Sequence, residues 1–241
     1  MHGTHPNKPL TIGEAKKIIG GSLSFPTKLP GTSYGLPARE CILGKKLAQI
    51  KGTVCSGCYA LADHYSWPNP VKAQYRRLAS LTDPRWVGAM VRLLLHYHSR
   101  PFIMIDTGKV RLGPDRWRPN PTGYHRWNDS GDLQSVQHFA MICEVARQTP
   151  KIKHWLPTQE LGFVRQYLRD GGAIPSNLLV RVSSVMIDDP VRRSWPTTSE
   201  VFADNLPADA HICPAPQQDH QCGSCRACWS SEVPHVAYAQ H

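Results

Sequence analysis

Hydrophobic residues in the second half of the chain alternate between strand-like runs and helix-like spacing. Short apolar runs at residues 124–127, 152–156 and 178–183 have the length of buried strands. Between them, apolar residues recur at three-to-four spacing over 136–146 and 160–169, as on one face of an amphipathic helix. Short connections between such elements favour parallel pairing through right-handed crossovers. The pattern predicts an α/β fold with parallel strands, arranged as a partial or full (β/α) barrel.

The first half of the chain is less regular. Residues 1–22 are expected to be weakly ordered apart from a short helix around Glu14 to Ile19, and residues 25–50 are rich in proline and glycine, which predicts irregular loop. Helical spacing follows over 71–81 and from Asp83 to Tyr97. Further short strands are predicted at 102–105 and 200–203.

These elements divide the chain into three parts. We expect a weakly ordered N-terminus (1–22), a barrel-like domain with an irregular cysteine-containing first segment (23–205), and a small cysteine-rich, metal-binding C-terminal extension (206–241). In a parallel α/β fold the chemistry sits at the carboxyl ends of the strands. The residues that follow each predicted strand are therefore candidate site residues.

Cysteine spacing gives the strongest chemical signal. Seven of the eight cysteines form an N-terminal group and a C-terminal group: Cys41, Cys55 and Cys58, then Cys213, Cys222, Cys225 and Cys228. The Cys-x2-Cys-x2-Cys run in the second group is more typical of a cubane than of zinc, whose ligands usually come as two separated pairs. Four thiolates close a [4Fe–4S] cluster, whereas three leave one iron open to substrate or cofactor. The sequence predicts one or two such clusters, the reactive one at the N-terminal group.

Other interpretations of the cysteines stay open. Zinc accepts mixed Cys/His ligands, so it could occupy both groups, with His64 or Cys143 completing the N-terminal one. By its position on an apolar helix face, Cys143 is otherwise expected to be a buried small hydrophobe. Disulfides need an oxidising compartment, and the polar start of the chain lacks the apolar stretch of a secretory signal. No apolar run has the length of a membrane span, so a cytoplasmic protein is expected, in the host cytoplasm if the chain is phage-encoded.

Three successive strand ends carry polar side chains. Ser130, Gly131 and Asp132 follow the first strand of the regular half, Thr158 follows the next, and Ser183 ends the third. Arg181 lies within that third strand, where a charged side chain must be paired or face a wet cavity. These residues are candidate cofactor- or substrate-binding positions: Ser130, Gly131, Asp132, Thr158, Arg181 and Ser183. Alternatively, Asp132 only caps the helix that follows, and Arg181 forms a structural ion pair.

The charge of the chain indicates an anionic partner. The formal net charge is +10 and the sequence pI is about 9.3. Two thiolate-ligated cubanes would reduce this excess to about +7. The basic residues are scattered rather than gathered in one run, so contact with nucleic acid or nucleotides and a merely solvated surface are both open.

The motifs in combination resemble the phage and prophage proteins of the gene product 88 family. The matching stretches are Lys28-Leu-Pro-Gly31, Cys55-Ser-Gly-Cys-Tyr-Ala60, Arg126-Trp-Asn-Asp-Ser-Gly-Asp-Leu133, His154-Trp-Leu-Pro-Thr158, Val180-Arg-Val-Ser183 and the Cys213 to Trp229 block. They cover most of the chain from about residue 25. The resemblance implies a phage origin and carries little biochemistry.

A more distant resemblance is to the radical S-adenosylmethionine enzymes. In those enzymes three cysteines hold a [4Fe–4S] cluster, and a Gly-Gly-Glu-type strand end contacts the amino group of the cofactor. The resemblance implies that Cys41, Cys55 and Cys58 bind the cluster and that Ser130 to Asp132 contact the methionine moiety. The family's usual spacing is Cys-x3-Cys-x2-Cys, whereas thirteen residues separate Cys41 from Cys55 here.

Three functional hypotheses follow. The first is a radical S-adenosylmethionine-type iron–sulfur enzyme, supplied by an electron donor and acting on nucleic acid or a nucleotide. The second is a non-catalytic zinc protein whose cysteine sites are structural and whose surface binds nucleic acid. The third is a cluster-based hydrolyase that uses the open iron as a Lewis acid and needs no S-adenosylmethionine.

Overall fold

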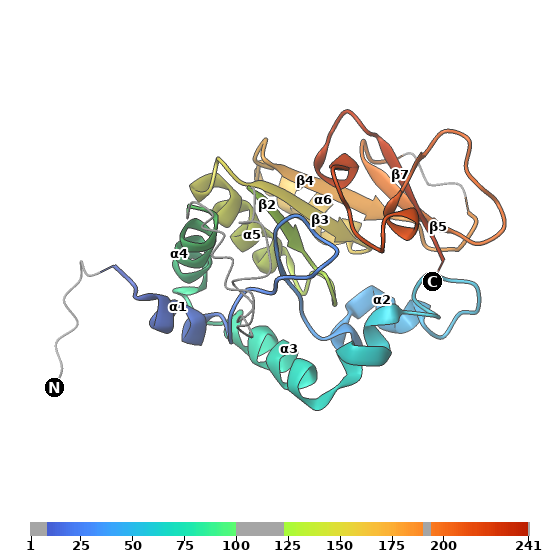
Figure 1. Ribbon diagram of the computed structural model, residues 1–241. Helices are drawn as coiled ribbons and strands as arrows, with labels where there is room; N and C mark the ends of the chain where they lie inside the picture. The colour runs from blue at the N-terminus through green and yellow to red at the C-terminus, as the bar shows by residue number, and fades with distance from the viewer. Residues whose placement is uncertain (1–8, 100–122, 190–193, 241) are drawn as a thin grey trace, which may run out of the picture.

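A parallel sheet forms the centre of the computed structural model, which describes residues 9–99, 123–189 and 194–240 (Figure 1). Its seven strands run in the order β1-β2-β3-β4-β5-β7-β6, and every neighbouring pair is parallel. The strands are β1 (Thr32–Tyr34), β2 (Tyr124–Trp127), β3 (Lys153–Thr158), β4 (Leu178–Ser183), β5 (Thr198–Phe202), β6 (His211–Ile212) and β7 (His235–Ala239). The helices are α1 (Ile12–Ile18), α2 (Ile42–Leu47), α3 (Pro68–Ser80), α4 (Trp86–His98), α5 (Val136–Gln148) and α6 (Leu161–Arg169).

The strand order explains the open shape of the sheet. The first five strands lie side by side in chain order, as expected when each right-handed crossover places the next strand next to the last. β1 and β6 are the two edges, so the described strands do not close into the full barrel that the sequence analysis allowed. The α/β class and the parallel pairing are confirmed.

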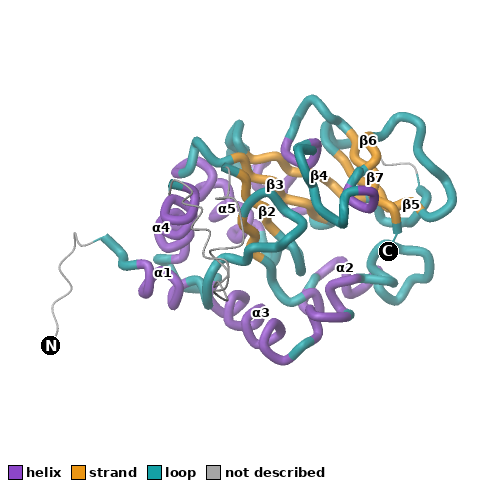
Figure 2. Tube along the Cα trace, in the orientation of Figure 1, coloured by secondary structure: helices purple, strands orange, loops and turns teal. Residues whose placement is uncertain are grey.

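One face of the sheet packs against helices. Side chains alternate between faces along a strand, and Trp127, Leu156 and Val180 all point to this side. They share one hydrophobic core with Trp86 of α4 and Phe139 of α5. Figure 2 shows α5 lying against the strands, with α4 beside α1 at one end of the molecule. Cys143 of α5 is fully buried in this core, which confirms its predicted role as a small hydrophobe and removes it from the N-terminal cysteine group.

The other face is covered by the end of the chain. Trp155 of β3 packs on Trp229 with ring centroids 5.1 Å apart, and the Trp229 indole donates to the backbone oxygen of His125 at 2.9 Å. Two short turns carry this segment, η5 (Ala215–Gln217) and η6 (Ala227–Trp229). The C-terminal residues also supply β6 and β7, so the segment expected as an extension is built into the sheet.

Most of the predicted regular elements are present, with shifted ends. The strands at 124–127, 178–183 and 200–203 appear as β2, β4 and β5, and the helix near Glu14 appears as α1. Residues 9–22 are better ordered than expected, because Thr11 and Glu14 form a capping box and α1 packs on α4. The loop expected at 25–50 contains β1 and α2. The strand expected at 102–105 lies outside the described residues. No helix in the described part of the chain is long and apolar enough to cross a membrane.

Neutral histidines in the core make stability sensitive to acid. Burial lowers the pKa of His154 to about 3 and that of His138 to about 4, and it lowers the pKa of His125 well below the usual 6.5. A depressed histidine pKa contributes stability above the unfolded-state value, and this is lost as pH falls toward the folded value. Each of these histidines should therefore lower the free energy of unfolding by about 2 kcal/mol when the pH falls from 7 to 5.

Between pH 7 and pH 5, the free energy of unfolding of His154→Gln should fall by about 2 kcal/mol less than that of the wild type. Urea unfolding at both pH values measures the difference. Burial raises the pKa of Asp132 to about 7, which changes stability with pH in the opposite sense. This contribution is the same in both proteins and cancels in the comparison. A surface control, His220→Gln, should show the wild-type pH dependence. Equal losses in His154→Gln and the wild type would contradict the neutral state assigned to this side chain.

Candidate functional site

The three N-terminal cysteines lie close to one another, and we name this group of thiols the three-cysteine pocket. Cys41 precedes α2, and Cys55 and Cys58 lie on the turn that leads to η2 (Tyr59–Leu61). A Cβ placed on Gly44 would lie 3.6 Å from both the Cys41 and the Cys55 sulfur atoms. Glycine at this position therefore lets the helix approach both sulfurs closely. The thirteen residues between Cys41 and Cys55, which include α2, bring Cys41 beside the Cys-x2-Cys turn. The sequence alone could not decide this.

The thiols of this pocket share their environment with two carboxylic acids. Burial raises the pKa of Cys41, and Asp132, Cys58, Cys55 and Glu160 raise it further. Burial and the same acidic neighbours raise the pKa of Cys55 to about 11. Burial also raises the pKa of Cys58, while the N–H groups of Ala60 and Leu61 act in the opposite sense. An anionic state of these groups requires a compensating cation.

The pocket is fixed to the carboxyl edge of the sheet. Val54 N–H donates to the carbonyl of Val185, just beyond β4, at 2.9 Å. Glu160, just beyond β3, accepts a 2.6 Å hydrogen bond from Leu43 N–H of α2. The Thr53 hydroxyl closes the cysteine turn by donating to the Leu47 carbonyl at 2.7 Å. These contacts place the three thiols where parallel folds carry their chemistry.

Asp132 organises the neighbouring strand ends. Its carboxylate accepts hydrogen bonds from the Thr158 hydroxyl at 2.6 Å and from Gln159 N–H at 2.8 Å. Asn128 and Leu133 also donate to it. Burial raises the pKa of Asp132 to about 7, with the hydrogen bonds acting against this rise. The interpretation of Asp132 as a helix cap is wrong, because Ser135 is the N-cap of α5.

Other predicted site residues lie along the same edge with structural partners. The Ser130 hydroxyl donates to the carbonyl of Leu36 at 2.8 Å, which ties β2 to the loop after β1. Gly131 has φ +71°, and a Cβ there would lie 2.7 Å from the same carbonyl, so the turn requires glycine. Ser183 accepts a long 3.4 Å contact from Ser199 across β4 and β5. Ser130, Gly131, Asp132 and Thr158 are thus brought together, whereas Ser183 belongs to the β4–β5 side.

Arg181 has a different environment from the one expected. It is fully buried, and its guanidinium donates to five backbone carbonyls, those of Thr198, Ala227, Ser230, Val233 and Pro234, at 2.8 to 3.3 Å. Four of these carbonyls belong to the C-terminal segment. Arg181 therefore holds that segment on the sheet, and neither the structural ion pair nor an open cavity describes its surroundings.

The C-terminal cysteines also gather in one place, beside Tyr238 of β7. The sulfur of Cys228 lies 3.2 Å from the Tyr238 hydroxyl, and Cys225 lies 3.4 Å from Nε2 of His211. Burial raises the pKa of Cys228 to about 11, and Cys213 and Cys222 add to the rise. Cys213 and Cys225 likewise raise the pKa of Cys222, so Cys222 lies within electrostatic reach of the other three thiols. His211 is a potential metal ligand that spacing analysis missed.

Arg126 lies between the two cysteine groups. Its guanidinium stacks on Trp155, 4.6 Å from the ring centroid, and donates to the hydroxyl of Tyr59 at 3.1 Å. Tyr59 directly follows Cys58, and the charge of Arg126 also lowers the pKa of Cys222. As a charge within a strand, Arg126 was expected to be paired or to face a wet cavity, and its partners here are an aromatic ring and a tyrosine hydroxyl.

In the described residues, no three histidine, cysteine or carboxylate side chains converge closely enough to hold a single metal ion.

In a comparison with known families, residues 6–236 match a model described as gene product 88. No curated protein and no solved structure matches the chain. The resemblance to radical S-adenosylmethionine enzymes has no support in these comparisons and stays a prediction.

Proposed function

Because this chain belongs to the gene product 88 family, whose description states no activity, we propose its function from the two cysteine groups. It is an iron–sulfur protein with a reactive [4Fe–4S] cluster at Cys41, Cys55 and Cys58 and a second cluster at the C-terminal group. The observation that carries the proposal is the three-thiol pocket at the carboxyl edge of a parallel sheet, beside Asp132 and Glu160. Three thiolates bind three irons of a cubane and leave the fourth open.

The donor set is compatible with a cluster. Three cysteines at the start of α2 and on the turn before η2 suit a cubane, because each thiolate binds a different iron. The raised pKa of Cys55, about 11, describes the protein without metal, and metal coordination deprotonates a thiol outright. N–H groups of Ala60 and Leu61 directed at Cys58 would stabilise that thiolate.

The finer proposal is an enzyme of radical S-adenosylmethionine type on a partial barrel, acting on nucleic acid or a nucleotide. When bound, a reduced cluster with an open iron supplies one electron to a ligand at that position. The chain's own part is to position this ligand. Ser130, Gly131 and Asp132 shape the adjoining strand end. One carboxylate oxygen of Asp132 accepts a hydrogen bond from Gln159 N–H alone, so it can accept another from a ligand. Thr158 and Glu160 fix the orientation of that loop.

The decisive experiment is iron, zinc and acid-labile sulfide analysis of protein purified without oxygen, with a visible spectrum. We expect about eight irons and eight sulfides per chain and broad absorption near 400 nm. About two zinc ions and a colourless protein would replace the proposal by the structural zinc alternative. With clusters in place, binding and reductive cleavage of S-adenosylmethionine separate the radical enzyme from the hydrolyase, which needs no such cofactor.

A further inference from the structure

The segment that carries the N-terminal cysteines is also the most basic part of the chain. Residues 38–80 contain seven lysines and arginines and two acidic residues, which accounts for half of the net charge of +10. Arg39 and Lys72 are exposed. Arg76 and Arg77 of this segment contact the N-terminal residues instead, through the carbonyls of Gly20 and Ser22.

The same segment exposes large aromatic and aliphatic side chains. Trp67 is 63% exposed, Tyr59 is 45% exposed, and Leu61 and Tyr75 are nearly as accessible. Tyr59 and the half-buried Tyr65 pack edge to face with ring centroids 5.6 Å apart, so the exposed Tyr59 ring is held in place. Exposed large hydrophobic groups close together usually mark a binding surface.

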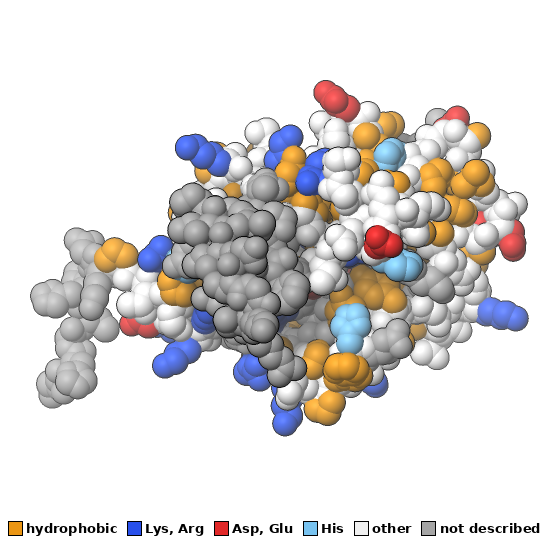
Figure 3. All heavy atoms as spheres, in the orientation of Figure 1, with side chains coloured by type: hydrophobic (Ala, Val, Ile, Leu, Met, Phe, Trp, Pro, Cys, Tyr) orange, Lys and Arg blue, Asp and Glu red, His pale blue; other side chains and the backbone are white. Residues whose placement is uncertain are grey.

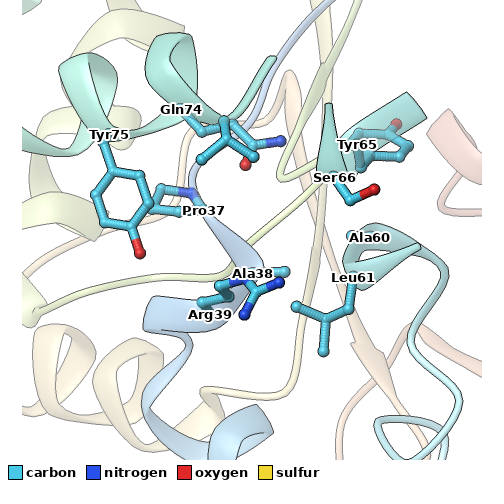
Figure 4. Close-up of a pocket in the computed structure, with 10 residues that line it drawn as sticks. Pro37, Ala38, Arg39, Ala60, Leu61, Tyr65, Ser66, Gln74 and Tyr75 are labelled. Carbon is cyan, nitrogen blue, oxygen red and sulfur yellow. The ribbon is translucent and has the colours of Figure 1, made fainter. Parts of the chain in front are cut away.

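These basic and aromatic groups are adjacent. Arg39, Leu61, Tyr65 and Tyr75 line one surface pocket, and Figure 4 shows Arg39 between Tyr75 of α3 and Leu61. Lys72 is three residues before Tyr75 on α3, so both side chains lie on one helix face. Figure 3 shows hydrophobic and basic side chains next to each other where α3 lies. We name this the aromatic-basic surface: Arg39, Tyr59, Leu61, Trp67, Lys72 and Tyr75.

We propose that the aromatic-basic surface binds single-stranded nucleic acid and presents it to the three-cysteine pocket. Exposed rings stack on unpaired bases, and lysine and arginine side chains contact the phosphates. Tyr59 joins the surface to the pocket, because it follows Cys58 directly and is hydrogen bonded to Arg126. The inference deepens the proposed function by naming the form of the substrate, and it relies on that function only for the chemistry.

A single strand fits this surface better than a duplex. Bases in a duplex are stacked on one another and offer no free face to Trp67 or Tyr59, whereas unpaired bases do. The charged residues are also interleaved with the rings rather than arranged as a separate stripe. The surface therefore combines the two components that single-strand binding requires.

The test is fluorescence anisotropy with a labelled single-stranded DNA of about 20 nucleotides, with the matching duplex as competitor, between about 50 and 200 mM salt. We expect the single strand to bind at least tenfold more tightly than the duplex and to weaken as salt rises. Trp67→Ala should weaken binding about tenfold. Arg39→Gln with Lys72→Gln should weaken it further and reduce the salt slope by about 1.4.

Matched controls remove side chains of the same kinds from outside the aromatic-basic surface. Leu206→Ala removes another exposed hydrophobic side chain, and Lys151→Gln with Arg169→Gln removes two exposed charges from the helix-bearing side. Both controls should bind like the wild type. Equal losses in the control and test variants, tighter duplex binding, or no binding at the lowest salt would each overturn the proposal. Metal content measured on every variant separates failure of this surface from failure of the cluster assignment.

Discussion

Replacing Cys55 by alanine is expected to lower the iron content of anaerobically purified protein from about eight to about four per chain. A cubane with only two thiolates from the pocket is not retained, whereas the C-terminal group lies on the other side of Arg126 and keeps its iron. Cys55 is suited to this test because it is half-buried on a turn and contributes no side chain to the hydrophobic core. Iron and sulfide analysis with visible spectroscopy measures the outcome.

Cys143→Ala is the matched control. This thiol is fully buried in α5, so its loss should cost about 1–2 kcal/mol of stability and leave the iron content at about eight. Cys225→Ala should remove the other half of the iron. Full iron content in Cys55→Ala, or an equal loss in Cys143→Ala, would contradict the assignment of the N-terminal pocket as a cluster site.

The regular half of the fold could be predicted because its periodicity is local. Each element of this half buries one face or both, and the spacing of its apolar residues indicates which: β2, α5, β3, α6 and β4. β1 could not be predicted in the same way. It is three residues long in a proline- and glycine-rich region, and it exists because Thr32 to Tyr34 pair with β2, far away in sequence.

The candidate site shows the same division. Cysteine spacing indicated two groups, and the structure brings Cys41 close to Cys55, while the metal at each group stays a prediction. The partners of the thiols were not predictable: Glu160 reaches α2 across more than a hundred residues, and Arg126 stacks on a strand that follows it. Arg181 was expected to be paired or to face a wet cavity, because it is a charge within a strand. Its partners are backbone carbonyls, which carry no sequence signature.

Replacing Arg181 by methionine should destabilise the protein by about 4–5 kcal/mol and loosen the C-terminal segment. The side chain is fully buried, and its loss takes a donor from five backbone carbonyls. Those of Ala227, Ser230 and Pro234 each keep one backbone N–H donor. Each charge-assisted bond contributes about 1.5–3 kcal/mol, and the contributions are not additive because the acceptors share one guanidinium. Urea unfolding measures the loss, and limited proteolysis should show new cleavage between residues 213 and 234.

Two further variants, Arg181→Lys and Arg165→Met, separate the effect of the lost hydrogen bonds from that of the lost charge and of an arginine-to-methionine change as such. Lysine keeps the charge but has three donors instead of five, so it should recover only part of the stability. Arg165 is exposed on α6, and its replacement by methionine should change stability by less than about 0.5 kcal/mol. Because Arg181 fixes the carbonyl of Ala227, next to Cys228, its loss should also lower the iron held by the C-terminal group while the N-terminal group keeps its own. A loss below about 1 kcal/mol with unchanged proteolysis would mean that the sheet holds this segment without Arg181.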